Sequence, residues 1–201
     1  MAVTGTEIKW TKYIPHVPHL KQHAFLWLNC QEALYGGAAG GGKSDALLMA
    51  ALQYVDVPGY AAILFRRTYA DLSLPGAIMT RSHEWLSRTD AKWNENRKQW
   101  RFPSGATLTF AYMDTEKDRY RYQGSDYQYI GFDEVTQFKE EDYRYLFSRL
   151  RRPKAPTGDS EHDEQMRRIV GGLSRVPLRM RAATNPAGDG PLWVRGRSLE
   201  K

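Results

Sequence analysis

Short apolar runs and amphipathic stretches alternate along most of the chain, and turn residues separate them. Four apolar runs have the length and the aliphatic or aromatic content of strands buried in a sheet, at 32–35, 60–65, 127–132 and 176–184. Helical patterns lie before or between these runs, at 19–28, 46–52, 77–88 and 140–149. Because strands that alternate with helices are joined by crossovers, this order predicts an α/β fold with a mostly parallel central sheet and helices on both faces.

A different pattern lies between the second and third of these runs. Residues 100–102 and 108–112 alternate in polarity, and Pro103, Ser104 and Gly105 between them are turn residues. This arrangement predicts a β-hairpin in addition to the parallel strands.

Two segments lack a periodic pattern. Residues 1–18 contain two prolines and predict an irregular N-terminal arm, which precedes a single domain at 19–197. Residues 152–164 are polar, contain prolines and lack large apolar side chains. They predict an exposed or mobile loop within the domain, which we extend to 152–168.

Composition narrows the class of protein. A chain of 201 residues, 41% hydrophobic and 26% charged, is an ordinary globular domain with room for a substantial core. The sequence has no apolar run near the length of a bilayer span and no N-terminal signal pattern, so we expect no membrane association. The one cysteine, Cys30, excludes an internal disulfide and fits a reducing, intracellular setting. The formal net charge of +6 favours polyanionic partners without identifying one.

Residues 36–44 carry the most specific chemical signal, a glycine-rich run that ends in Lys43 and Ser44. From Gly37 the run fits the P-loop spacing, with four residues between Gly37 and Gly42. Glycines let backbone N–H groups turn toward a triphosphate, and the helix that begins here directs its positive end toward the same charges. The strand before the run and the helix after it favour nucleotide binding over a plain flexible turn.

The P-loop assigns roles to its own residues. We expect Lys43 to reach the β- and γ-phosphates of ATP and the Ser44 hydroxyl to bind Mg²⁺. The expected nucleotide-binding set is Gly37, Ala38, Ala39, Gly40, Gly41, Gly42, Lys43, Ser44 and Asp45.

Two acidic residues, Asp133 and Glu134, follow the apolar run at 127–132. Beside a P-loop, Asp133 is expected to hold Mg²⁺ through its water shell, and Glu134 to orient or deprotonate the attacking water. An exposed turn is the alternative. A GTPase would carry an Asn-Lys-x-Asp guanine motif, which the sequence lacks. A glutamate beside the metal-binding aspartate instead indicates the ATPases with an additional strand, which include motors, helicases and recombinases.

Thr184 and Asn185 lie where the last predicted strand leaves the sheet, and Pro186 follows them. Their polar side chains can contact the γ-phosphate or the attacking water, or they can form an ordinary Asn-Pro turn. Without the other motifs, the turn is the simpler interpretation.

Taken in order, these motifs resemble the large terminase subunit of tailed bacteriophages, the ATP-driven motors that package double-stranded DNA into a preformed capsid. The resemblance covers about residues 18–197 and rests on Gln22, the P-loop run, Phe-Arg-Arg-Thr at 65–68, the Phe-Pro-Ser-Gly hairpin, Tyr-Ile-Gly-Phe-Asp-Glu and Ala-Thr-Asn-Pro. It implies a P-loop NTPase of the additional-strand, catalytic-glutamate (RecA-like) type, with ATP and Mg²⁺ as cofactors.

The resemblance also implies roles for residues outside the P-loop. Gln22 matches the position that contacts adenine, although a solvated helix glutamine is an equal alternative. Thr184 and Asn185 match the coupling motif that links the state of the γ-phosphate to domain movement.

An arginine finger would complete a catalytic set with Glu134 and Lys43, and a neighbouring subunit often supplies it. Arg121, shortly before the Asp-Glu strand, is the first candidate. The next candidates are Arg119, Arg66 and Arg67. A surface or DNA contact is the alternative for each of these arginines.

Partners follow from the resemblance as well. They are double-stranded DNA, further copies of the chain in a homo-oligomeric ring, the portal protein and the small terminase subunit. The implied location is the host cell cytoplasm, with transient docking on the viral procapsid. Terminase large subunits also carry a C-terminal nuclease domain, for which the 201 residues leave no room, so we expect no nuclease activity in this chain.

Two alternative functions stay open. One is another RecA-like DNA-dependent ATPase of the helicase or recombinase type. The other is a nucleotide-gated assembly module that hydrolyses ATP weakly on its own.

Two basic clusters are candidates for DNA contact, with solvated charge or pairing within the chain as the alternative. The first consists of Arg149, Arg151, Arg152 and Lys154. The second consists of Arg167, Arg168, Arg175, Arg179 and Arg181.

Overall fold

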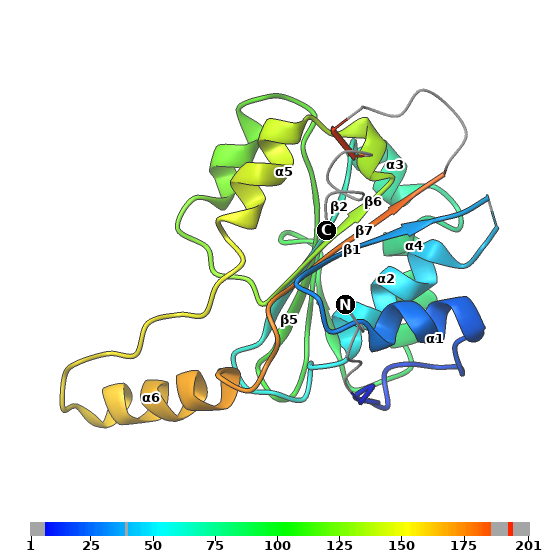
Figure 1. Ribbon diagram of the computed structural model, residues 1–201. Helices are drawn as coiled ribbons and strands as arrows, with labels where there is room; N and C mark the ends of the chain where they lie inside the picture. Colours follow the sequence, from blue (N-terminus) through cyan, green and yellow to red (C-terminus); the bar gives the residue numbers. More distant parts are fainter. Residues whose placement is uncertain (1–6, 39, 186–192, 195–201) are drawn as a thin grey trace.

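The computed structural model describes residues 7–38, 40–185 and 193–194, which fold around one seven-stranded sheet (Figure 1). In spatial order the strands are β1 (Glu32–Gly36), β7 (Arg179–Thr184), β6 (Tyr129–Asp133), β2 (Ala61–Arg66), β5 (Thr107–Tyr112), β4 (Gln99–Arg101) and β3 (Lys92–Asn94). The first five pair in parallel, and β4 and β3 add an antiparallel edge. The predicted mostly parallel sheet is confirmed, and β4 and β5 form the predicted hairpin.

Helices cover both faces of the sheet, as the alternation of side chains along β2 shows. Ala62 and Leu64 belong to one buried cluster, whereas Ile63 and Phe65 belong to another on the opposite face. The first cluster lies under α1 (Leu20–Trp27), α2 (Lys43–Leu52) and α4 (Ile78–Leu86). The second lies under α5 (Glu140–Phe147) and the 3-10 helix η2 (Val135–Gln137). No helix in the described ranges is long and apolar enough to cross a bilayer.

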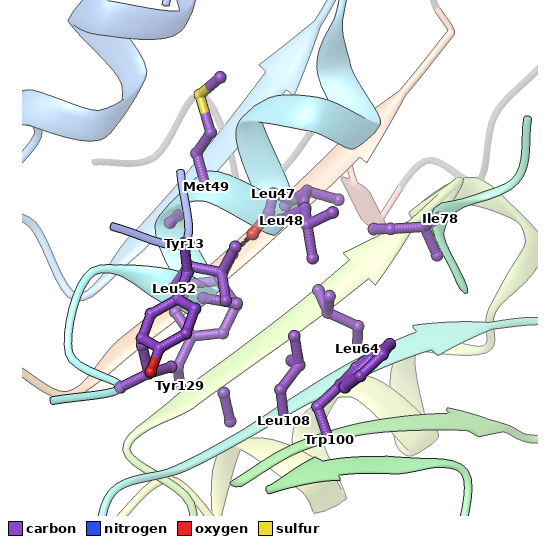
Figure 2. Close-up of a cluster of buried hydrophobic side chains, with 14 of the residues drawn as sticks. Tyr13, Leu47, Leu48, Met49, Leu52, Leu64, Ile78, Trp100, Leu108 and Tyr129 are labelled. Carbon is purple, nitrogen blue, oxygen red and sulfur yellow. Dashed lines mark hydrogen bonds between the residues drawn. The ribbon is translucent and has the colours of Figure 1, made fainter. Parts of the chain in front are cut away.

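Helix α2 is the centre of the larger cluster because it is apolar around its whole circumference. Residues 46–52 are all buried, as expected for a helix packed between a sheet and other helices. In Figure 2, Leu47 and Leu48 lie over Leu64 and Leu108 of the sheet. The Tyr129 hydroxyl donates to the Leu47 carbonyl at 3.0 Å and so ties β6 to α2. This packing fixes the start of α2, where the P-loop ends.

The part of the predicted arm that the structure describes, residues 7–18, forms no helix or strand but packs onto the core. Ile8 and Tyr13 are buried in the cluster around α2. Thr11 donates a hydrogen bond to the Leu52 carbonyl at 3.1 Å, and the Tyr13 hydroxyl donates to Asp90 at 2.8 Å. The arm therefore contributes to the same core as α2.

The predicted loop over 152–168 is wrong in its second half, where α6 (Glu161–Leu173) begins. Ser160 caps this helix: its hydroxyl accepts from the Asp163 N–H at 3.1 Å, and the Asp163 carboxylate accepts from the Ser160 N–H at 3.3 Å. The apolar positions follow helical spacing but lie beyond the polar stretch, at Met166, Ile169, Val170 and Leu173. Residues 152–160 carry no helix or strand.

The sequence pattern did not predict the short elements of the fold, which include α3 (Tyr69–Ser73) and strand β3. Three residues are too few for the alternation of β3 to stand out. Trp93 of β3 nevertheless packs against Trp100 of β4, with ring centroids 5.2 Å apart. Because successive side chains of a strand point to opposite faces, the residues on either side of Trp93 and Trp100 point to the other face of the sheet.

Candidate active site

Three parallel strands deliver the motif residues to one edge of the sheet. The P-loop follows β1, Asp133 ends β6 and Thr184 ends β7. Gly36 lies opposite Thr184 in register, and Asp133 lies opposite Ala183. Strand β7 therefore lies between β1, which leads into the P-loop, and β6, which ends in Asp133. Strand β7 is the additional strand that the Asp-Glu pair predicts. Ligands of open parallel sheets bind at these carboxyl ends.

The backbone of the P-loop has the conformation that its glycines permit. Gly40 and Gly42 have φ of 77° and 67°, in the left-handed region, and Gly42 is the N-cap of α2. A Cβ at Gly42 would also lie 2.5 Å from the Gln22 Nε2. Ala39 lies outside the described residues. A cavity of about 220 Å³ adjoins the loop and is lined by Lys21, Tyr35, Gly36, Gly37, Ala38, Gly40, Gly41 and Lys43.

The buried side chain of Lys43 turns back over its own loop. Its Nζ donates to the carbonyls of Gly37 and Ala38 at 3.0 and 2.8 Å, and to the Asn185 Oδ1 at 2.7 Å. The ammonium group is therefore held where the loop surrounds the predicted phosphate position. Its third contact reaches the end of the additional strand, where the predicted coupling motif lies.

Ser44 and Asp133 meet as the metal prediction requires. The Ser44 hydroxyl lies 3.1 and 3.3 Å from the two oxygens of Asp133. Arg66 approaches the same carboxylate, with Nε 3.5 Å from Oδ2, and this buried Nε makes no hydrogen bond. Burial raises the pKa of Asp133 above its ordinary value, Arg66 opposes that rise and Glu134 adds to it.

This pair of groups fits Mg²⁺. A hydroxyl and a carboxylate supply the hard oxygen ligands that Mg²⁺ prefers, and water and phosphate oxygens complete such sites. The described residues hold no cluster of three or more His, Cys, Asp or Glu side chains that could bind a metal alone.

Glu134 and Asn185 form the second half of the site. Glu134 has φ of 57°, a left-handed conformation that is costly for a non-glycine residue and that directs its carboxylate toward β7. The Asn185 Nδ2 donates to Glu134 Oε1 at 2.9 Å, and the Asn185 N–H donates to Oε2 at 3.4 Å. Because its Oδ1 accepts from Lys43, the Asn185 amide bridges the ammonium group and the carboxylate. An ordinary turn would not require these contacts, although Pro186 lies outside the described residues.

A comparison with protein families identifies the family of this chain. The sequence model of the family described as terminase large subunit, T4likevirus-type, N-terminal, matches residues 34–155, more than half of the 201 residues. The chain belongs to this family. Comparison with curated proteins finds no match.

Solved terminases share the fold. The large terminase of the HK97 bacteriophage aligns with a TM-score of 0.58 and 12% identity over 90% of this chain and 36% of that chain. A large terminase from a thermophilic bacteriophage gives 0.55 and 17% over 85% and 37%. The large terminase ATPase domain of a Thermus phage gives 0.52 and 15% over 94% and 89%. The chain thus spans just over a third of the first two proteins and most of the isolated ATPase domain. The predicted P-loop, RecA-like fold class is confirmed.

Gln22 is buried, with 2% of its surface exposed, so the alternative of a solvated glutamine is wrong. Its Nε2 donates to the Gly42 carbonyl at 2.7 Å, and its Oε1 accepts from the His19 N–H at 3.0 Å. His19 and Tyr35 also reach the loop, each 3.3 Å from the Gly41 carbonyl. These two residues carry no motif in the sequence, and contact with adenine by Gln22 stays a prediction.

Other residues around the site anchor its elements. Asp45, predicted within the nucleotide-binding set, accepts two hydrogen bonds from Arg81 at 2.8 and 3.0 Å and so ties α2 to α4. The Thr184 and Thr136 hydroxyls lie 3.0 Å apart, which joins the predicted coupling motif to the turn after Glu134. No sequence motif identified Thr136.

The candidate arginine fingers occupy different places. Arg121 pairs with Asp118 at 3.0 Å, and 58% of its side chain is exposed. Arg119 pairs with Glu141 and Asp142, and Arg67 donates to the Asp114 carbonyl. Among these candidates, Arg66 is the one that reaches an acidic residue of the site, the predicted metal ligand Asp133.

Most of the predicted DNA-contact clusters are engaged within the chain. Arg179 and Arg181 are buried, and Arg181 donates to the carbonyls of Leu28 and Gln31. Burial lowers the pKa of Arg181 to about 10. Further arginines bind chain oxygens: Arg151 that of Asp126, Arg152 those of Leu173 and Val176, Arg167 that of Gly158, and Arg168 that of Glu164. Pairing within the chain is the better account of these residues.

Proposed function

We propose that this terminase domain hydrolyses ATP with Mg²⁺ and thereby drives double-stranded DNA into a procapsid. The observation that carries the proposal is the bridge through Asn185, which joins Lys43 of the P-loop to Glu134 after β6. A site that only bound nucleotide would not need a carboxylate held in this position. A hydrolytic site does need a group that orients and deprotonates water.

Each residue of the site then has a defined task. Lys43 exchanges its contacts with the Gly37 and Ala38 carbonyls for the β- and γ-phosphates. Ser44 and Asp133 hold Mg²⁺, which neutralises charge on the phosphate oxygens when bound. Glu134 accepts a proton from the water that attacks the γ-phosphorus, and the bond to the β-phosphate oxygen breaks. Asn185 keeps Glu134 oriented through the hydrogen bonds that it donates to the carboxylate.

Asn185 also provides a route from chemistry to movement. When Lys43 turns to the phosphates, Asn185 loses one of its two bridging partners. Because Thr184 contacts Thr136, this change reaches both β7 and the turn after Glu134. This is the role that we propose for Thr184 and Asn185 in coupling.

We further propose that Arg121 is the arginine finger and acts on a neighbouring subunit. Its exposed position at the end of the 3-10 helix η1 (Asp118–Tyr122) supports a role between subunits. A homo-oligomeric ring would place one subunit's Arg121 at the next subunit's site. The partners that we propose beyond DNA are the portal protein and the small terminase subunit, in the host cytoplasm and transiently at the procapsid.

Steady-state ATP hydrolysis against protein concentration tests this proposal, with Glu134→Gln as the blank. We expect turnover per subunit to rise with concentration in the wild type and to stay low in Arg121→Ala. Concentration-independent turnover would place the finger within one chain. Turnover equal to the blank at every concentration would reject hydrolysis by this chain and favour an assembly module. Separation of duplex strands during turnover would instead favour a helicase.

A further inference from the structure

The antiparallel strands β4 and β3 lie at the end of the strand order opposite to β1 and the P-loop, and one face of the sheet is polar there. Strand register places Lys92 opposite Arg101 and Asn94 opposite Gln99. Thr107 and Thr109 of β5 continue these two rows. Since Trp93 and Trp100 pack on the α2 side, the six polar residues share the other side. We call them the basic sheet face: Lys92, Asn94, Gln99, Arg101, Thr107 and Thr109.

The cations of this face are unpaired. Like charges directly opposite each other destabilise a strand pair, and Lys92 and Arg101 are such a pair. Neither side chain makes an ion pair, hydrogen bond or ring contact with any described residue, nor does that of Arg97 in the adjoining turn. The one carboxylate of the hairpin, Glu95, is paired with Lys98. The basic sheet face itself contains no acidic residue.

Edge protection explains only part of this arrangement. Charged residues on an edge strand prevent pairing with other chains, and β3 is an edge strand, so Lys92 fits that role. Arg101 lies on β4, which pairs on both sides and needs no such protection. The repulsion between Arg101 and Lys92 destabilises the pairing of β3 and β4, and edge protection does not explain it. The position of Arg101 therefore indicates an anionic partner.

The chemistry of the face matches a phosphate backbone. Lysine, arginine, threonine, asparagine and glutamine side chains all donate hydrogen bonds to phosphate oxygens, and such contacts carry no sequence information. A motor that moves along any sequence requires contacts of this kind. We propose that the basic sheet face contacts the phosphate backbone of double-stranded DNA. This inference rests on the proposed function and names the surface that holds its substrate.

The test is the affinity of the 201-residue chain for a fluorescein-labelled random duplex, measured by anisotropy at several salt concentrations. The test variant is Lys92→Gln with Arg101→Gln. The matched control is Arg88→Gln with Lys117→Gln, which removes two exposed cations that lie outside both predicted DNA-contact clusters and also lack ion pairs with the described residues. Circular dichroism and the urea unfolding midpoint verify that both variants fold.

Loss of two phosphate contacts should reduce the slope of log affinity against log salt by about 2, because each contact contributes about 0.9. The control should keep the wild-type slope. An unchanged slope in the test variant, or an equal decrease in the control, would overturn the assignment of this face. If the wild type itself binds no duplex at low salt, DNA translocation by this chain fails as well, so the two failures are distinguishable.

Discussion

The two ends of the strand order use polar residues in opposite ways. At the carboxyl ends of β1, β7 and β6, the polar side chains contact one another, and Asn185 joins Lys43 to Glu134. On β3 and β4, the side chains of Lys92 and Arg101 make no ion pair, hydrogen bond or ring contact with any described residue, and they repel each other. The difference teaches that a catalytic site requires side chains that contacts within the chain hold in place before the ligand binds. A surface for a partner keeps its charges free instead.

The largest effect should come from Glu134→Gln at the paired end. The amide keeps the shape of the side chain but cannot accept a proton from water. We expect turnover to fall by a factor of about 10² to 10⁴, the range attributed to general base catalysis. Nucleotide binding, followed with a fluorescent ATP analogue, should be retained. Loss of binding together with turnover would mean that Glu134 supports the fold of the site rather than the chemistry.

Asn185→Asp tests whether the bridge orients Glu134. The new carboxylate keeps an acceptor for Lys43, but it loses the side-chain donor to Glu134 and places a like charge beside Glu134. We expect turnover to fall by about 10- to 100-fold, equivalent to a lost charged hydrogen bond. Asn185→Ala is the matched control, because it removes both contacts without adding charge. Equal turnover in Asn185→Asp and the wild type would remove Asn185 from the mechanism.

Arg66→Ala tests the charge balance around Asp133 through stability. Burial raises the pKa of Asp133 above its unfolded value and Arg66 opposes that rise, so the variant should raise this pKa further. The ionised carboxylate would then lack its cation, at a cost of about 1 to 3 kcal/mol near pH 7. This cost should shrink as pH falls through the Asp133 pKa, because a protonated carboxyl needs no cation.

Urea unfolding at a series of pH values from 7 down to 3.8, the ordinary pKa of an aspartate, measures this difference, with Arg66→Lys as the charge-preserving control. A stability loss of the same size across the whole series would show that Arg66 contributes packing instead of charge.

The smallest effect should come from the unpaired end. Lys92→Gln with Arg101→Gln removes repulsion and no attractive contact, so we expect the free energy of unfolding to change by no more than about 0.5 kcal/mol. Any change should be stabilising. A decrease above about 1 kcal/mol in the free energy of unfolding, measured with urea, would mean that these side chains stabilise the hairpin. Lys92 and Arg101 would then not differ from the paired Arg66 in their effect on stability.

The sequence pattern predicted the elements that depend on residues close together in the chain. The P-loop, the strand before Asp133 and the apolar helix after Lys43 depend on residues close in sequence, and each is confirmed as a structural element. The contact of Arg66 with Asp133 depends on β2 lying beside β6, and strand order is not a local property. Thr136 and His19 were missed for the same reason, because their partners Thr184 and Gly41 lie far from them in the sequence.

Helix α6 shows the opposite limitation. Its capping residues Ser160 and Asp163 were present in the sequence, but the polar composition of 152–164 outweighed them. The apolar face that stabilises the helix falls almost entirely after that stretch. The average composition of residues 152–164 therefore did not indicate the start of α6, which the two capping residues define.

Calorimetric titration of the chain with ATP, in the presence and absence of Mg²⁺, tests the central claim that three strand ends form one Mg²⁺–ATP site. We predict one site per chain, tighter binding with Mg²⁺, and loss of that Mg²⁺ effect in Asp133→Asn while ATP alone still binds. ATP binding that is equally strong with and without Mg²⁺, or no binding at millimolar ATP, would contradict the account.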